Sequence, residues 1–476
     1  MDNSRVVSET GRIGPARLFE QGSGWVLAGT FVFATAAGLL IQWFILPVLL
    51  PGLHAGHGLQ AGGDWIGFHE YGLKLANALS SEGWSAFELR PVGNFPIAES
   101  GVLYFLTGVR EPWVVVPLDA LIYASAVLAV FNVFCRIAGR RAALIGLVPL
   151  VLFPGAIQFY SQVEKDVWAF AGSAWLLFVI TALMRPTALS WRQCSGLIVV
   201  TFMAAGFAWL VRPYFSVVQL GAFACGGIIA LSSFCLPGGR PRRAVRLACL
   251  LGCAGVIAVF AAGVPAALWP SLKANNASNL LAVHGSTRPN PDCVTQPGEL
   301  DRLMPAVARR PLQSIASIRA DQRAATGYAG SNIDNDACFS RASDVVRYLP
   351  RALQIALFAP FPDMWFERGV SIGARAMRAI SGLEMLCVYI LLPGVALAIW
   401  QARGRRRYVF VILAVVVPIV LLLAATIPNI GTLYRMRYGY LQVLAGLGAI
   451  GWIELLRLKR VAGLGMLRPA EKEAVG

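Results

Sequence analysis

An aspartate in a glycine turn near the start of the chain has the character of a catalytic base. Asp64 follows two glycines and precedes a tryptophan, and His69 and Glu70 come shortly after it. Glycine lets a turn approach a substrate closely, and aromatic rings that exclude water raise the proton affinity of a carboxylate. Asp64 could therefore serve as a general base or a metal ligand. It could also cap the helix predicted to follow it, and the sequence leaves both readings open.

A second group of charges lies at the consecutive residues Glu164, Lys165 and Asp166. Such a triplet can form a local ion cluster that serves structure alone. Alternatively, Lys165 can bind a phosphate beside a second acidic group. The sequence does not decide between these two roles.

Arginines occupy two further positions that fall on the same side in the topology derived below. Arg212 stands at the end of an apolar run and is followed by a proline and Tyr214, while Arg435 and Arg437 lie in the short segment 429–437. Guanidinium groups on that side suit an anionic lipid headgroup, such as a phosphate or diphosphate. The alternative is that these side chains reach out to ordinary phospholipid headgroups.

The composition indicates that these residues are carried by a membrane-embedded scaffold. The chain has 476 residues, of which 57% are hydrophobic and 14% charged, and this is too apolar for an ordinary soluble domain. Runs of about 20 apolar residues cross a bilayer as helices, so the predicted fold class is an all-α polytopic membrane protein. The ten predicted spans are 25–50, 113–135, 142–160, 167–184, 195–211, 215–236, 247–269, 380–400, 408–427 and 438–456. The net charge of +16 is spread between these runs, which argues against a nucleic-acid partner.

Basic residues set the orientation, because they gather at every second connection. These residues are Arg136, Arg140 and Arg141, then Arg185 and Arg192, then the arginines of 240–246 and 403–407, and finally Arg457, Lys459 and Arg460. The predicted organisation is a cytoplasmic N-terminus (1–24), a seven-span module (25–269) with the outer loop 51–112, a second outer loop (270–379), a three-span module (380–456) and a cytoplasmic tail (457–476). We expect a bacterial inner membrane, with all the candidate residues on its outer side.

The two large outer loops have features of folded structure. Trp65, Phe68, Leu75 and Leu79 share one face of a predicted helix, and the segment 348–358 repeats the pattern, so both loops are expected to carry membrane-surface helices. Cys293 and Cys338 lie together in the second loop on the oxidising side, and we predict a disulfide between them. No metal is assigned to the four histidines, because their spacing matches no metal signature.

Two acidic residues fall inside predicted spans. Asp119 and Glu384 both lie close to an outer boundary. Acids within a membrane suggest a functional role by default, although pairing between helices is an equally good reading.

Taken together, these features resemble the GT-C superfamily of integral membrane glycosyltransferases, which includes the protein mannosyltransferases and the lipid A aminoarabinose transferases. The resemblance spans most of the chain. It is carried by the inside N-terminus, Asp64 in the first outer loop with surface helices after it, Lys165 and Asp166 in the next short outer loop, and arginines in later ones. The chain departs from the family by lacking the Asp-Glu pair of protein mannosyltransferases and the WWDYG-type signature of oligosaccharyltransferases, which leaves donor and acceptor open.

The resemblance implies transfer of a sugar from a polyprenyl-phosphate donor to a lipid, glycan or protein acceptor, with inversion. Asp64 would be the general base and Asp166 the second catalytic residue. The residues implied in binding the leaving phosphate are Lys165, Arg212, Arg435 and Arg437, with Tyr214 beside them. Glu70 and Asp166 would orient the acceptor or, in metal-dependent branches of the family, hold a divalent cation.

Two other functions compete with this reading. A polymerase or ligase of lipid-linked O-antigen or exopolysaccharide units would depend instead on residues of the second outer loop, namely His284, Arg309, Arg310, Arg319 and Arg323. A flippase for lipid-linked glycans would show broken helices and polar residues near the midplane, whereas the predicted spans are almost uniformly apolar.

Overall fold

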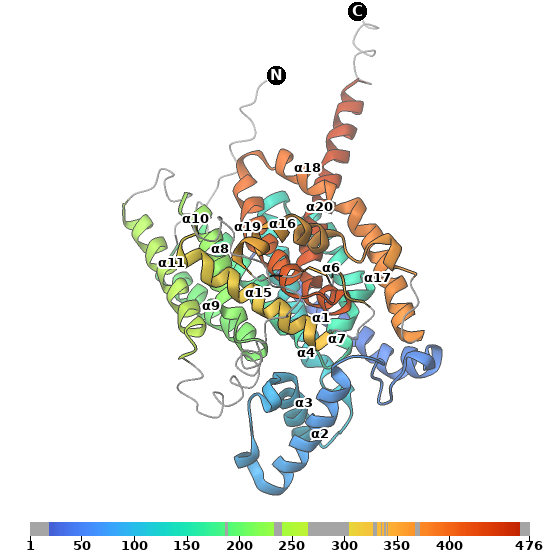
Figure 1. Cartoon of the computed structure of the whole chain (residues 1–476). Coiled ribbons are helices and arrows are strands. Elements are labelled where there is room, and N and C mark those ends of the chain that lie inside the picture. The colour runs from blue at the N-terminus through green and yellow to red at the C-terminus, as the bar shows by residue number, and fades with distance from the viewer. Residues whose placement is uncertain are drawn as a thin grey trace, which may run out of the picture.

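The computed structural model is built from helices and connecting segments throughout the part of the chain that it describes (Figure 1). That part comprises residues 19–185, 189–232, 240–264, 304–326, 331–334, 336–337, 339, 341–366 and 372–466. Nine of its helical segments are long and apolar enough to cross a membrane, and the number rises to ten if one bent pair of helices counts as a span. The predicted fold class, an all-α polytopic membrane protein, is confirmed.

Each candidate span overlaps one of the ten runs predicted from the sequence. The helices that form them are α1 (Ser23–Leu40), α4 (Val116–Ala138), α8 (Asp166–Leu183), α9 (Trp191–Val211), α10 (Phe215–Ser232), α11 (Arg240–Ala261), α17 (Ile372–Leu391) with α18 (Pro393–Gln401), α19 (Arg406–Thr426) and α20 (Ile430–Met466). The π-helix η2 (Ile41–Leu49) continues α1.

The third predicted span is broken. It consists of α5 (Arg140–Gly146), α6 (Val148–Leu152) and α7 (Pro154–Ser161), with a bend of 64° where α7 begins. Proline has no N–H to continue the helical ladder and clashes with the carbonyl one turn earlier, so Pro154 starts a new helix after the extended residue Phe153. The sequence pattern predicted residues 142–160 as one uninterrupted span, because a single proline hardly lowers the mean hydropathy of a run of about 20 residues.

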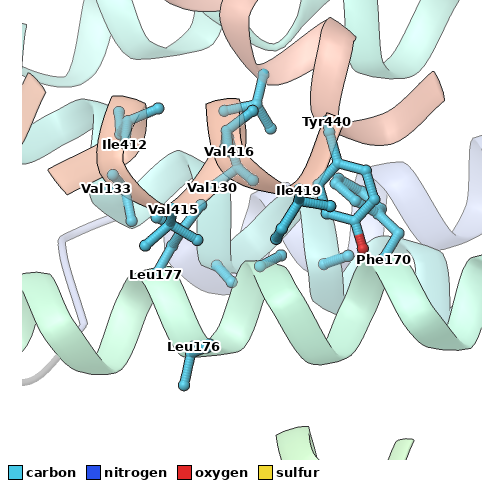
Figure 2. Close-up of a cluster of buried hydrophobic side chains, with 14 of the residues drawn as sticks. Val130, Val133, Phe170, Leu176, Leu177, Ile412, Val415, Val416, Ile419 and Tyr440 are labelled. Carbon is cyan, nitrogen blue, oxygen red and sulfur yellow. The ribbon is translucent and has the colours of Figure 1, made fainter. Parts of the chain in front are cut away.

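The centre of the protein is formed by α4, α8, α19 and α20. Val130 of α4, Leu177 of α8, Val415 of α19 and Tyr440 of α20 belong to one buried cluster (Figure 2). Helix α8 is apolar on all sides, and 94% of its span window is buried, whereas for α1 the share is 22%. A helix that is hydrophobic all round belongs inside a bundle, so α8 is the helix around which the others pack.

The connections predicted to be cytoplasmic lie together at one end of the bundle. Arg185 pairs with Glu20, and Arg246 donates a hydrogen bond of 2.5 Å to the backbone carbonyl of Arg185. Arg405 donates to the carbonyl of Ile137 at 3.4 Å. Figure 1 shows the hairpin of α2 (Trp65–Glu82) and α3 (Phe95–Thr107) at the opposite end from the last turns of α20.

Both predicted outer loops contain helices in the parts that the structure describes, as the periodicity predicts. Helix α2 contains the residues of the predicted apolar face and packs on α3. Helix α16 (Ala342–Phe358) contains the predicted segment 348–358 and packs on α19, and α15 (Ala306–Thr326) lies beside α16. The short segment after α15 is fixed to the start of α20: Ile333 donates to the carbonyl of Pro428 at 3.0 Å, and Ile430 donates to that of Ser331 at 2.9 Å. The predicted disulfide of Cys293 and Cys338 lies outside the described residues.

Close packing of α20 depends on glycine, and this yields a stability prediction. A Cβ at Gly451 would lie 1.9 Å from the carbonyl oxygen of Gly394 on α18, so Gly451→Leu has to push the two helices apart. Overpacking of this kind costs about 1–3 kcal/mol, and the thermal midpoint of the detergent-purified protein should fall accordingly. Gly255→Leu is the control, because a Cβ at Gly255 has no atom within 4 Å in the described structure; equal midpoints for the two variants would contradict this packing.

Candidate functional site

One guanidinium group connects three carboxylates at the end of the bundle where α2 and α3 lie. Arg435, in the second turn of α20, holds its Nη2 2.8 Å from Oδ2 of Asp64, its Nε 3.1 Å from Oδ2 of Asp166 and its Nη1 3.5 Å from Oε2 of Glu164. Asp64 and Arg435 are 371 positions apart in the sequence. Residues from three connections predicted on the same side of the membrane therefore form one site.

A second arginine reaches the same cluster through Asp166. This residue begins α8, where the positive end of the helix dipole favours a carboxylate, and its Oδ1 lies 2.5 Å from Nη1 of Arg212, which directly follows α9. Only 3% of the Asp166 side chain and 7% of the Arg212 side chain are exposed. Burial lowers the pKa of Arg212, but the adjacent Asp166 carboxylate outweighs it and raises that pKa above its usual value.

Asp64 differs from the other two acids because its side chain is 52% exposed. It precedes α2, yet within the described chain its carboxylate makes no capping hydrogen bond to that helix and turns to Arg435 instead. Burial raises the pKa of Asp64, and the charge and hydrogen bond of Arg435, helped by Lys165, outweigh burial and bring it below its usual value. Asp64 is thus an ionised, solvent-accessible carboxylate at the edge of the cluster.

Lys165 adds a third positive charge beside the cluster. Its Nζ donates to Oδ1 of Asn94 at 3.3 Å and lies 5.4 Å from the centre of the Phe68 ring. Burial and the neighbouring Arg212 lower its pKa, while Asp166 and Glu164 oppose that shift. Both contacts of this ammonium are to neutral groups, and no carboxylate of the described residues lies within ion-pair distance of it.

Three residues predicted for the site lie apart from these ion pairs. Arg437 is fully buried, and its guanidinium donates to the carbonyls of Ile355 and Ala356 at the end of α16. The segment 429–437 was predicted to be a loop, but α20 begins at Ile430, and residues two apart on a helix point about 200° away from each other. Glu70 is exposed on α2, and Tyr214 is 43% exposed next to Arg212.

A pocket lies on the other side of Arg435, between α7 and the first turns of α20. It is small, with room for about one water molecule, and Gln158, Glu164 and Tyr434 are among its lining residues. Behind it, Glu384 of α17 accepts hydrogen bonds from the Gly155 N–H and the Tyr434 hydroxyl. The break in the third span therefore supplies a backbone donor to this wall, which the sequence gave no reason to expect.

The sequence did not predict that two acids near the site are buried as a pair. Glu99 of α3 and Asp119 of α4 are 5% and 0% exposed, and the carboxyl of Glu99 lies against Asp119 and the indole of Trp168. Burial raises the pKa of Glu99 from 4.5 to about 8. Asp119 was noted as an acid within a span, but its partner Glu99 stands in an outer loop, where an acid is usually exposed.

The described residues contain no group of three or more His, Cys, Asp or Glu side chains that could hold a metal ion. Three of the histidines have protein partners: His54 accepts a hydrogen bond from the Gly58 N–H at 2.9 Å, His57 lies 3.0 Å from Glu111, and His69 lies 2.9 Å from the Tyr104 hydroxyl. His284, the histidine on which a polymerase would depend, lies outside the described residues.

Comparison with known proteins returned no relative for this chain. No protein-family model, curated protein or solved structure matches it. What the site can do chemically therefore has to be inferred from its own geometry and charges. Its main feature is the half-exposed carboxylate of Asp64 next to three cations, Arg435, Lys165 and Arg212.

The buried Asp166–Arg212 pair should be essential for stability. Removing one member of a buried pair leaves the other charge uncompensated, at a cost of about 3–5 kcal/mol, so Arg212→Met should lower the thermal midpoint strongly. The double variant Asp166→Asn/Arg212→Met should recover part of the loss. Arg457→Met is the control, since its ion pair with Glu454 is exposed and such pairs contribute about 0–1 kcal/mol; an Arg212→Met midpoint as high as this control's would refute the assignment.

The Glu99 carboxyl should make the protein less stable as the pH rises. Its pKa is raised from 4.5 to about 8, so the folded protein binds its proton more tightly than the unfolded chain does; the resulting stabilisation is complete below pH 4.5 and is lost as the pH passes 8. Glu99→Gln, which resembles the protonated acid, should flatten the fall in thermal midpoint between pH 5 and 9. Glu70→Gln is the matched exposed control, and an unchanged slope in Glu99→Gln would show that this carboxyl does not titrate there.

Proposed function

We propose that the protein is a membrane glycosyltransferase of the GT-C type, which moves a sugar from a polyprenyl-phosphate donor to a lipid, glycan or protein acceptor. One observation carries this proposal: the half-exposed carboxylate of Asp64 lies 2.8 Å from Arg435, at the end of an apolar bundle. A polyprenyl chain stays in the bilayer, so its sugar phosphate is presented at the membrane interface. A charged cluster at the end of the bundle can meet the sugar phosphate there.

The chemistry follows from the charges. Asp64 takes the proton from an acceptor hydroxyl, and the oxygen attacks the anomeric carbon from the side opposite the phosphate. The bond between that carbon and the phosphate oxygen breaks, polyprenyl phosphate leaves, and the configuration at the carbon inverts. Arg435, Lys165 and Arg212 supply fixed positive charge where the leaving phosphate gains negative charge, which is the main means by which enzymes stabilise such a transition state.

Asp166 acts in this scheme through the two arginines. It is nearly fully buried between Arg212 and Arg435, at 2.5 Å and 3.1 Å, so its role is to hold their guanidinium groups in position. Arg437 has the same kind of structural role toward α16. The phosphate-binding set is therefore narrower than the one implied by the family resemblance.

The proposed location is a bacterial inner membrane, with both termini in the cytoplasm and the site on the outer face. Support comes from the arginine-rich connections, which gather at the opposite end of the bundle from Asp64. Arginine and lysine are enriched on the cytoplasmic side of membrane proteins.

The contacts of Arg319 favour the transferase over the polymerase. Arg319 is nearly fully buried, donates to the carbonyls of Ala424 and Ala425 at 3.5 and 3.4 Å, and bonds the Tyr348 hydroxyl at 3.2 Å. It fixes the second outer loop to the end of α19, so this arginine serves structure where a polymerase would need it at the substrate.

The decisive experiment is sugar transfer by purified protein in lipid bilayers, with a panel of polyprenyl-phosphate sugars as donors. Loss of a general base typically costs 10²–10⁴-fold in rate, so Asp64→Asn should lower transfer by about that factor. Glu82→Gln removes an exposed carboxylate from α2, the helix that Asp64 precedes, and should leave the rate within about two-fold of the wild type. Full activity in Asp64→Asn, or reaction only with preassembled diphosphate-linked oligosaccharides, would favour the polymerase instead.

A further inference from the structure

The base and the leaving-group ligand of the proposed reaction are bound to each other in this structure. Asp64 and Arg435 lie 2.8 Å apart, so the carboxylate that must accept a proton is neutralised by the guanidinium that must hold a phosphate. A paired carboxylate is a weak base, because the adjacent positive charge favours its ionised form. The free protein is therefore in a state that does not favour catalysis.

The three carboxylates on Arg435 are not equally easy to displace. The side chains of Glu164 and Asp166 are 1% and 3% exposed, whereas that of Asp64 is 52% exposed. A buried carboxylate that lost its cation would remain as an uncompensated charge. Water can solvate Asp64 when it leaves, because about half of its side chain is already exposed. Asp64 is thus the partner that an incoming anion can replace.

The surroundings of Arg435 suit a phosphate as that anion. A guanidinium binds phosphate through two parallel N–H groups, and the shorter charge-assisted bonds are the stronger ones. Within the described part of the chain, the Lys165 ammonium contacts Asn94 and the Phe68 ring and forms no ion pair, so it can take up further negative charge without giving one up.

We infer that the phosphate of a lipid-linked donor displaces the Asp64 carboxylate from Arg435, and that this exchange frees Asp64 to act as the base. The inference rests on the proposed function and adds its regulation: donor binding switches the base on. When the polyprenyl phosphate leaves after transfer, Arg435 returns to Asp64 and the site is switched off again.

The test measures binding of polyprenyl monophosphate by purified protein in phosphatidylcholine nanodiscs, with polyprenol as the uncharged comparison. If Asp64 competes with the phosphate for Arg435, then Asp64→Asn should bind the lipid about two- to five-fold more tightly than the wild type, the range expected for an ion pair with one solvent-exposed member. Glu82→Gln, at an exposed position on α2, makes the same change of charge and should leave the affinity unaltered. Lys165→Met should weaken binding several-fold.

The outcomes separate the two proposals. Weaker binding by Asp64→Asn, or an affinity equal to that of Glu82→Gln, would overturn the exchange while leaving a transferase with Asp64 as base intact. If the wild type did not distinguish polyprenyl phosphate from polyprenol, the proposed function would fail with it. A parallel titration with inorganic phosphate should show much weaker binding; equal affinity would overturn a lipid as the source of the phosphate. Asp64 is half-exposed, so Asp64→Asn should keep the wild-type thermal midpoint, which is checked first.

Discussion

The site depends on a single guanidinium that joins parts of the chain made at very different times. Arg435 connects α20 with the start of α2 and the start of α8, and through Asp166 it is coupled to Arg212 at the end of α9. Charges this deeply buried are tolerated only when their geometry is good and their partners are present. The packing of four helices is therefore constrained by the need to bring these side chains together at one end.

The position of Arg435 is itself secured from the other faces of α20. Arg437 binds the last carbonyls of α16, and the Tyr434 hydroxyl binds Glu384 of α17. The segment before the helix is held by backbone hydrogen bonds to Ser331 and Ile333. Residues 331–333 and the last turn of α16 thus help to orient the first turns of α20, and those turns present one arginine to the site and another to the scaffold.

Part of this arrangement could be predicted from the sequence, because it depends on signals that are local. Apolar runs long enough to cross a bilayer revealed the spans. The glycine turn pointed to Asp64, and basic residues in short outer loops, where they are usually rare, pointed to Lys165, Arg212 and Arg435. That Arg437 points away from the site could not be predicted, because it depends on α20 beginning at Ile430, which places Arg435 and Arg437 on opposite faces of one helix. The pairing of Glu99 with Asp119 depends on tertiary packing, which leaves no mark in hydropathy. The bend at Pro154 follows from a local signal, the proline itself, but a hydropathy average hardly registers it.

The great sequence distance between Asp64 and Arg435 bears on how the protein is made. Chains are synthesised from the N-terminus, and domains fold in that order, so Asp64, Glu164 and Asp166 enter the membrane long before the arginine that completes their cluster. Until the last span arrives, Asp166 has Arg212 as its partner and Glu164 lacks the guanidinium that faces it in the finished protein. An unfinished chain cannot assemble the cluster, so the site forms only after the last span has been made.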